Sequence, residues 1–80
     1  MSDRLKELED ILKDFFELPE LNLRRSMQAK DIEGWDSLAH LDLMAKLEED
    51  YSIKFSLAEI TGLNNAGELA DLIDKKINKN

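Results

Sequence analysis

Apolar residues recur at helical spacing in three parts of the chain. The N-terminal repeat consists of Leu5, Leu8, Ile11, Leu12, Phe15 and Phe16, on one side of a predicted helix. Pro19 prevents this helix from continuing, so we expect it to end near Glu17. The C-terminal repeat follows Asn64 and Asn65, and it presents Leu69, Leu72, Ile73 and Ile77 to a core. The pattern therefore predicts a helix at each end of the chain.

The middle repeat predicts a helix that begins in "EGWDSLAHLDL" and reaches Tyr51. One stripe has the three-four spacing of a core face and consists of His40, Leu43, Met44, Leu47 and Tyr51. A second stripe is apolar at its start and acidic at its end, and consists of Leu38, Leu41, Asp42, Ala45, Glu48 and Glu49. A purely solvated face has little use for two leucines, so we expect a partner to cover part of the second stripe.

The connections between these helices also carry apolar residues. The first, residues 18–36, is broken by Pro19 and Gly34, and its apolar residues predict that it packs over the helices. After Tyr51, "SIKF" reads as an extended connector that inserts Ile53 and Phe55 into the core.

One further short helix completes the predicted fold. In "SLAEITG", Ser56 and Glu59 have the spacing of a capping box and Gly62 is a plausible stop, so this helix has one or two turns. We therefore expect an all-α fold, a small antiparallel four-helix bundle with a long first loop and a short third helix. The 80 residues suit a single domain, residues 1–80.

Composition and charge narrow the possible functions. The chain has no cysteine, so thioester chemistry would need an imported sulfur, and a cysteine-based zinc site is excluded. The N-terminus is charged from its third residue and no apolar run reaches membrane-spanning length, which predicts a cytoplasmic protein without membrane insertion. The formal charge of -7 disfavours nucleic acid and favours protein partners with Lys and Arg patches. We expect a monomer.

Groups for catalysis or metal binding are hard to find. His40 is the only histidine, and Ser37 three residues earlier could approach it, but no oxyanion donors are evident. The carboxylates of "DIEGWDS" lack the spacing of a calcium loop. We therefore expect neither catalytic residues nor a metal site.

Ser37 has two interpretations. It could cap the helix, as Ser often does, although it has His40 where the capping box around Ser56 has Glu59. It could instead be an attachment point, because a helix N-terminus tolerates a phosphodiester. Spacing alone leaves both open, with the cap the more frequent case.

The run "DIEGWDSLAHLDLMAKLEE", residues 31–49, resembles the signature region of the acyl carrier protein family, in which an Asp-Ser-Leu triplet opens the second helix. The resemblance extends through "YSIKF" and the last helix. It implies that Ser37 carries 4'-phosphopantetheine, installed from coenzyme A by a phosphopantetheinyl transferase, with Asp36 helping that enzyme to recognise the site. The thiol of this group would carry an acyl or aminoacyl thioester, and the chain itself would have no enzymatic activity.

The resemblance also implies a docking surface for enzymes that load or transfer the acyl group and present basic patches. The matching positions are Leu38, Leu41, Asp42, Glu48 and Glu49, which coincide with the second stripe. The alternative function is an acidic helical interaction module without a prosthetic group, in which Ser37 is only a cap.

Three positions depart from carriers of bulk fatty-acid synthesis: Trp35, Ala39 and His40. Similar Trp-Asp-Ser-Leu sequences occur in carriers of polyketide, peptide or surface-polymer pathways, although Trp35 could simply anchor the loop. We therefore expect a small polar cargo held largely outside the bundle. The opposite expectation, an acyl chain sheltered between helices, would use Leu43, Leu47, Ile53, Phe55, Ile60, Leu63, Leu69 and Ile73, which otherwise form a closed core.

Overall fold

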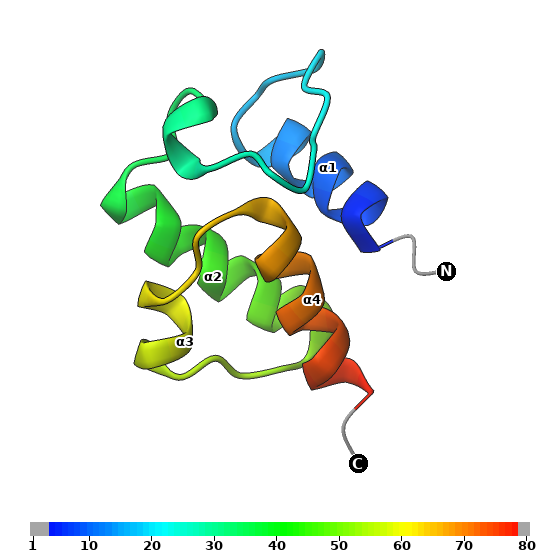
Figure 1. Cartoon of the computed structure of the whole chain (residues 1–80), viewed down its shortest axis with the longest axis vertical. Coiled ribbons are helices and arrows are strands. Elements are labelled where there is room, and N and C mark those ends of the chain that lie inside the picture. The colour runs from blue at the N-terminus through cyan, green and yellow to red at the C-terminus, as the bar shows by residue number, and fades with distance from the viewer. Residues whose placement is uncertain (1–3, 79–80) are drawn as a thin grey trace.

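The computed structural model describes residues 4–78, which form four α-helices and one 3-10 helix. In chain order these are α1 (Arg4–Phe15), η1 (Ala29–Asp31), α2 (Ser37–Tyr51), α3 (Leu57–Thr61) and α4 (Ala66–Ile77). Helix α1 runs antiparallel to α2 and α4, and α3 lies beside α2 on the side away from α1 (Figure 1). The all-α four-helix prediction is confirmed, whereas η1 was not predicted.

The core consists of the residues that the helical spacing selects. The largest fully buried side chains are Leu8, Leu12, Leu43, Met44, Leu47, Leu69 and Ile73. Phe55 is buried as well, which confirms that the "SIKF" connector contributes to the core. Leu23 and Ile32 of the first loop are also buried, so this loop packs over the helices as predicted.

Helix α1 ends at Phe15, two residues before the position expected from Pro19. Glu17 takes a left-handed conformation with φ 55° and reverses the chain. The backbone N–H of Leu18 then donates to the carbonyl of Lys13, and that of Glu17 donates to the carbonyl of Asp14. These two bonds satisfy carbonyls that the helix end would otherwise leave unpaired.

A buried carboxylate ties the first loop to α1. The Glu9 Oε2 atom accepts a hydrogen bond of 2.8 Å from the backbone N–H of Leu23, and Oε1 contacts Lys6 Nζ at 3.1 Å. Both contacts favour the charged form, and they hold the pKa of Glu9 below its ordinary value, the Leu23 bond having the larger effect. Glu9 therefore fixes the first loop against α1.

The same loop also caps α4. The N–H groups of Ala66 and Gly67 donate to the carbonyls of Met27 and Arg25, at 2.8 and 2.9 Å. This approach leaves no room for a side chain, since a Cβ on Gly67 would lie 2.9 Å from that of Arg25. The first loop is thus fixed to both terminal helices.

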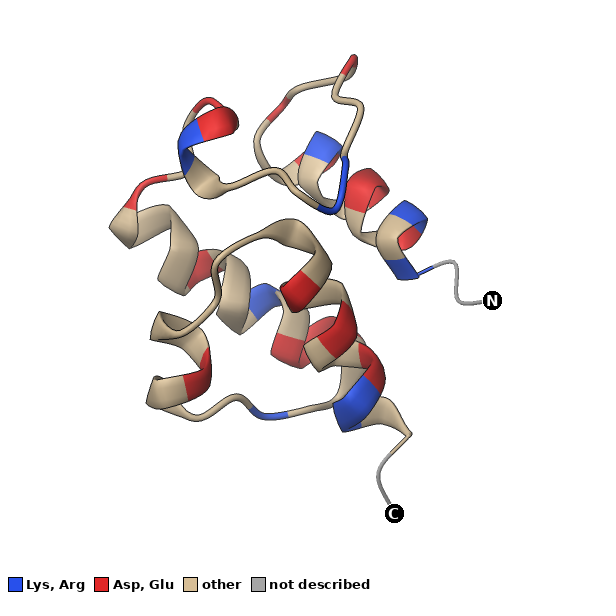
Figure 2. Cartoon of the chain, viewed as in Figure 1, with Lys and Arg blue, Asp and Glu red and all other residues tan. Residues whose placement is uncertain are grey.

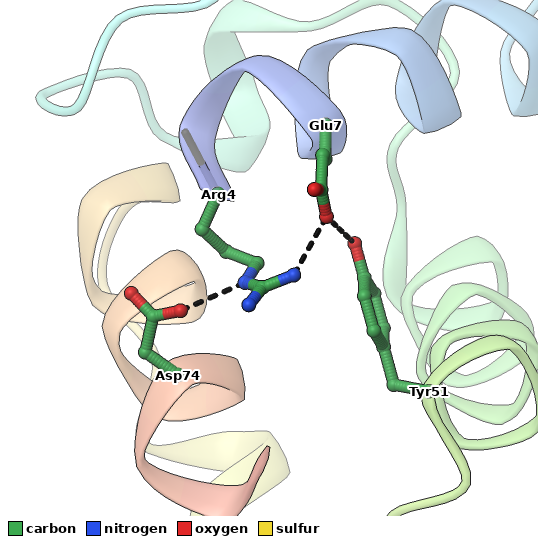
Figure 3. A network of polar contacts seen from close by, with 4 residues as sticks. All are labelled: Arg4, Glu7, Tyr51 and Asp74. Carbon is green, nitrogen blue, oxygen red and sulfur yellow. Dashed lines mark hydrogen bonds and ion pairs between the residues drawn. The ribbon is translucent and has the colours of Figure 1, made fainter. Parts of the chain in front are cut away.

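At the other end of the bundle, a polar network joins α1, α2 and α4 (Figure 3). Arg4 contacts Asp74 at 2.8 Å and Glu7 at 2.6 Å, and the Tyr51 hydroxyl donates to the same Glu7 oxygen at 2.9 Å. The guanidinium of Arg4 also lies over the Tyr51 ring, 5.2 Å from its centre. Burial, above all, raises the pKa of Tyr51, so its hydroxyl remains a donor to Glu7.

Candidate functional site

A tight turn leads into α2 and sets the position of Trp35 and Asp36. The Trp35 N–H donates to the carbonyl of Ile32 at 3.2 Å, and Gly34 takes a φ of 91° as the third residue of this turn. A positive φ at that place is typical of a type II turn and favours glycine. An added Cβ there would also meet the Phe16 ring at 3.4 Å.

The helix cap is Asp36, and Ser37 is the first residue of α2. The Asp36 Oδ1 atom accepts a hydrogen bond of 2.8 Å from the N–H of Ala39, and its carbonyl accepts one of 2.8 Å from His40. Ser37 is exposed, and its hydroxyl makes no hydrogen bond within residues 4–78. The cap interpretation of Ser37 is therefore wrong, because its neighbour performs that role.

Ser56 provides the matched comparison for a stability measurement. Its hydroxyl accepts from the Glu59 N–H at 3.1 Å while its own N–H donates to the Glu59 carboxylate at 2.8 Å, a complete capping box. Ser56→Ala should lower the free energy of unfolding by about 1 kcal/mol. Ser37→Ala should change it by less than about 0.5 kcal/mol. Urea unfolding of the unmodified proteins tests this; equal losses would mean that the Ser37 hydroxyl supports the fold.

Trp35 and His40 form a hydrogen-bonded connection from the first loop to α3. The Trp35 indole Nε1–H donates to His40 Nδ1 at 2.9 Å, and His40 Nε2 lies 2.9 Å from the carbonyl oxygen of Ile60. Since that oxygen only accepts, Nε2 carries the ring proton. The Trp35 ring is also nearly parallel to the rings of Phe16 and His40, with ring centres 5.5 and 5.8 Å away. The interpretation of Trp35 as a loop anchor is confirmed.

This connection removes His40 as a catalytic base. One ring nitrogen accepts from the indole and the other donates to a carbonyl, so neither can take a proton from the Ser37 hydroxyl. The described residues also contain no group of three or more His, Cys, Asp or Glu side chains that could hold a metal ion. Nor does any helix among them have the length and apolar character needed to cross a membrane.

Ser37 lies on a surface groove of about 670 Å³ between η1, the start of α2 and α3. The groove is lined by Ala29, Lys30, Trp35, Asp36, Ser37, His40, Leu41, Leu57, Ile60, Thr61 and Leu63. Leu41 and Leu57 are 50% and 71% exposed, which is unusual for such large apolar side chains. The groove thus combines an unbonded hydroxyl with an apolar surface.

The predicted docking residues lie along the outer side of α2. Leu38 is 70% exposed, and Asp42 and Glu49 are exposed as well. Figure 2 shows that the first turn of α2 carries no acidic residue and that carboxylates follow further along the helix. Glu48 differs: it is half-buried, and its Oε2 atom accepts a hydrogen bond of 2.8 Å from the Phe55 N–H. Glu48 therefore also fixes the connector that leads from α2 to α3.

The eight candidate residues for an interior acyl pocket differ in burial. Phe55 is buried in the core, and Ile53 is partly buried against it. Leu43, Leu47, Leu69 and Ile73 are at most 1% exposed and belong to the packed core. Ile60 and Leu63 line the surface groove instead. A small pocket of about 40 Å³ lies beside Leu63 and Leu69 and is too small for a medium-length acyl chain.

Sequence reasoning missed four residues of the groove, Ala29, Lys30, Leu57 and Thr61. Lys30 reaches it from η1, a helix without an apolar repeat, and Leu57 reaches it from the start of α3. The only signal for Leu57 was an apolar residue directly after the Ser56 cap, a position that usually faces solvent. Nothing in the sequence indicated Lys30, because its position depends on how the first loop folds.

These features match known proteins. A family model described as "Phosphopantetheine attachment site" matches residues 6–73. The chain is also similar to the solution NMR structure of a holo acyl carrier protein from Geobacter metallireducens, with 43% sequence identity and a TM-score of 0.88 over 95% of this chain and 87% of that one. The comparison with curated proteins found no significant match.

The all-helical fold and the match over most of the chain define a carrier protein and not an enzyme. The chain belongs to the acyl carrier protein family, whose prosthetic group is 4'-phosphopantetheine. Its general partners are therefore a phosphopantetheinyl transferase and enzymes that handle acyl groups. The alternative of an interaction module without a prosthetic group is set aside.

Proposed function

We propose that residues 1–80 form a single carrier domain that bears 4'-phosphopantetheine on Ser37 and carries acyl or aminoacyl groups as thioesters. The group supplies the thiol that this cysteine-free chain lacks. The observation that carries the proposal is that Asp36 and Ser37 have different roles at the start of α2. Asp36 caps the helix through its bond to Ala39, and this leaves the Ser37 hydroxyl exposed and unbonded at the edge of the groove.

The start of α2 also suits the charge of the proposed linkage. A phosphodiester on Ser37 would lie at the N-terminus of a helix of 15 residues, where free N–H groups and the helix dipole favour negative charge. The Asp36 carboxylate accepts a hydrogen bond from the Ala39 N–H, so it is held against the first turn of α2. The residues present therefore fit the group.

Partner enzymes would dock on the outer side of α2. The proposed surface consists of Leu38, Leu41, Asp42 and Glu49, with Glu48 at its border because that side chain also bonds to the connector. Exposed leucines next to carboxylates suit a partner that presents an apolar centre within a basic rim. Leu57, across the groove from Leu41, extends the apolar part of this surface.

The proposed cargo is a small polar acyl or aminoacyl group that stays in the surface groove. The core residues that an acyl chain would have to displace are fully buried, and the Trp35–His40–Ile60 connection fixes α3 against α2. A long chain would have to break this connection to enter the core. A specialised metabolite or surface-polymer pathway and a cytoplasmic location remain predictions.

The attachment site is tested by intact mass spectrometry. After incubation with coenzyme A and a broad-specificity phosphopantetheinyl transferase, the wild-type chain should gain the mass of one phosphopantetheine group. Ser37→Ala should gain none, whereas Ser56→Ala, the matched hydroxyl at the start of α3, should be modified like the wild type. An unchanged wild-type mass, or modification of Ser37→Ala, would show that the proposal is wrong.

A further inference from the structure

The groove beside Ser37 holds one cation that the carrier function has not used. Lys30 and Asp36 are the charged residues in its lining, and the Asp36 carboxylate is engaged by the Ala39 N–H. We propose that the Lys30 ammonium pairs with the phosphodiester that links the prosthetic group to Ser37, and so directs the arm over the groove. This inference rests on the proposed attachment at Ser37.

Lys30 is available for such a pair. It is exposed, and it forms no ion pair with any residue in the described range, although Asp31 is its neighbour in sequence. Asp31 instead accepts a hydrogen bond of 2.9 Å from the Gln28 N–H and closes the η1 turn. Basic residues that do pair with carboxylates are Arg4, Lys6, Lys13, Arg25, Lys46 and Lys76.

Arg24, Lys54 and Lys75 also form no ion pair within the described residues, and among these unpaired cations only Lys30 lines the groove. Carboxylates outnumber basic residues 18 to 11 in this chain, so a free cation has many competing acidic neighbours. The negative field of so acidic a protein opposes a phosphodiester, and a local cation would offset part of this repulsion in addition to the N–H groups of α2. Lys30 on η1 and Ser37 at the start of α2 line the same groove, so the lysine would add a compact positive charge to the N–H groups of α2 that act on the same anion.

Pairing would give the arm a direction. Lys30 lies on the η1 side of the groove, and Leu57 and Thr61 lie on its α3 side. An anion held between Ser37 and Lys30 starts the arm inside the groove, toward the apolar lining, and not along the outer face of α2. The docking surface at Leu38 and Asp42 would then stay clear for partner enzymes.

The test compares wild type, Lys30→Gln and Lys54→Gln, all converted to the holo form and verified by intact mass. Lys54 is also exposed and unpaired within the described residues, but it lies in the connector before α3 and does not line the groove. The phosphorus NMR signal is followed from low to high salt, because salt screens an exposed ion pair. The signal of wild type and Lys54→Gln should move with salt, and that of Lys30→Gln should move less than half as far.

Amide chemical shifts give a second readout. Conversion from apo to holo should shift the amides of residues 29–31 in the wild type but not in Lys30→Gln, while the shifts at residues 37–39 persist in both. Equal salt responses in all three proteins would overturn the inference. So would slower modification of Lys30→Gln with unchanged holo spectra, because Lys30 would then bind the transferase or coenzyme A. If the wild-type chain gains no mass in the reaction with coenzyme A and the transferase, the proposed function itself is wrong, and the spectra are not compared.

Discussion

Truncating Leu43 to Ala should lower the free energy of unfolding by about 2–5 kcal/mol, a large share of the stability of so small a domain. Leu43 is fully buried on the core face of α2, one turn after His40. The packed core around it cannot collapse completely, so the truncation leaves a cavity in addition to the lost burial. Urea unfolding measures the loss. The control is Leu57→Ala, which removes the same atoms from a side chain that is 71% exposed and should cost far less.

The Leu43→Ala variant also tests where the cargo resides. In the wild type, octanoyl and acetyl forms should melt at nearly the same temperature as the holo form, because the core has no room for a chain. In Leu43→Ala, the octanoyl form should melt above the acetyl form, since an apolar cavity gains roughly 0.8 kcal/mol for each methylene that it buries. A large rise for the wild-type octanoyl form would instead mean that the bundle opens for long chains, and the proposed small surface-held cargo would be wrong.

Helical periodicity predicted the core because a buried face must repeat every three or four residues. Leu43, Met44 and Leu47 were selected by spacing alone, and all three are buried. The cap of α3 was also predictable, because Ser56 and Glu59 belong to one local motif whose two hydrogen bonds need no distant partner. Features whose causes lie within one turn of the chain were therefore visible in the sequence.

The features that sequence reasoning missed depend on contacts between elements. No sequence pattern indicated a role for Glu9, whose carboxylate accepts a hydrogen bond from the Leu23 N–H of the folded loop. Glu48 looked like part of an acidic surface, yet it accepts a bond from Phe55. His40 could be placed on the core face, but its carbonyl partner at Ile60 is 20 positions away in sequence. No spacing rule within one helix predicts such pairs.

The choice between Asp36 and Ser37 as the helix cap is a second limit and an exception among local features, because this bond within one turn of the chain could not be assigned from the sequence. Both residue types are favoured caps, and the two are adjacent, so composition could not separate them. A shift of one residue in the helix start decides which side chain bonds to the helix and which remains free. The structure places the bond at Asp36, and the function proposed for Ser37 depends on that difference.

Reversing the charge of Asp42 and Glu49 to Lys should slow modification by the transferase on the order of tenfold at low salt, because exposed carboxylates steer a basic partner to its docking surface. Both side chains are exposed and form no ion pair within residues 4–78. Glu48 is left intact, since its reversal would also remove the bond to Phe55 and confuse docking with folding. Initial rates are measured by intact mass at several salt concentrations, and the defect should shrink as salt rises.

The matched control is the double reversal of Asp10 and Asp14 on α1, which are also exposed and make the same change in net charge. If the docking surface lies on α2, this control should slow modification much less than the reversal of Asp42 and Glu49. The urea concentration at the midpoint of unfolding should be nearly the same for both double variants and the wild type. Isolated surface charges contribute little to stability. Equal defects in the two variants would mean that net charge alone attracts the transferase, and unchanged rates in both would mean that the carboxylates of α2 only face solvent.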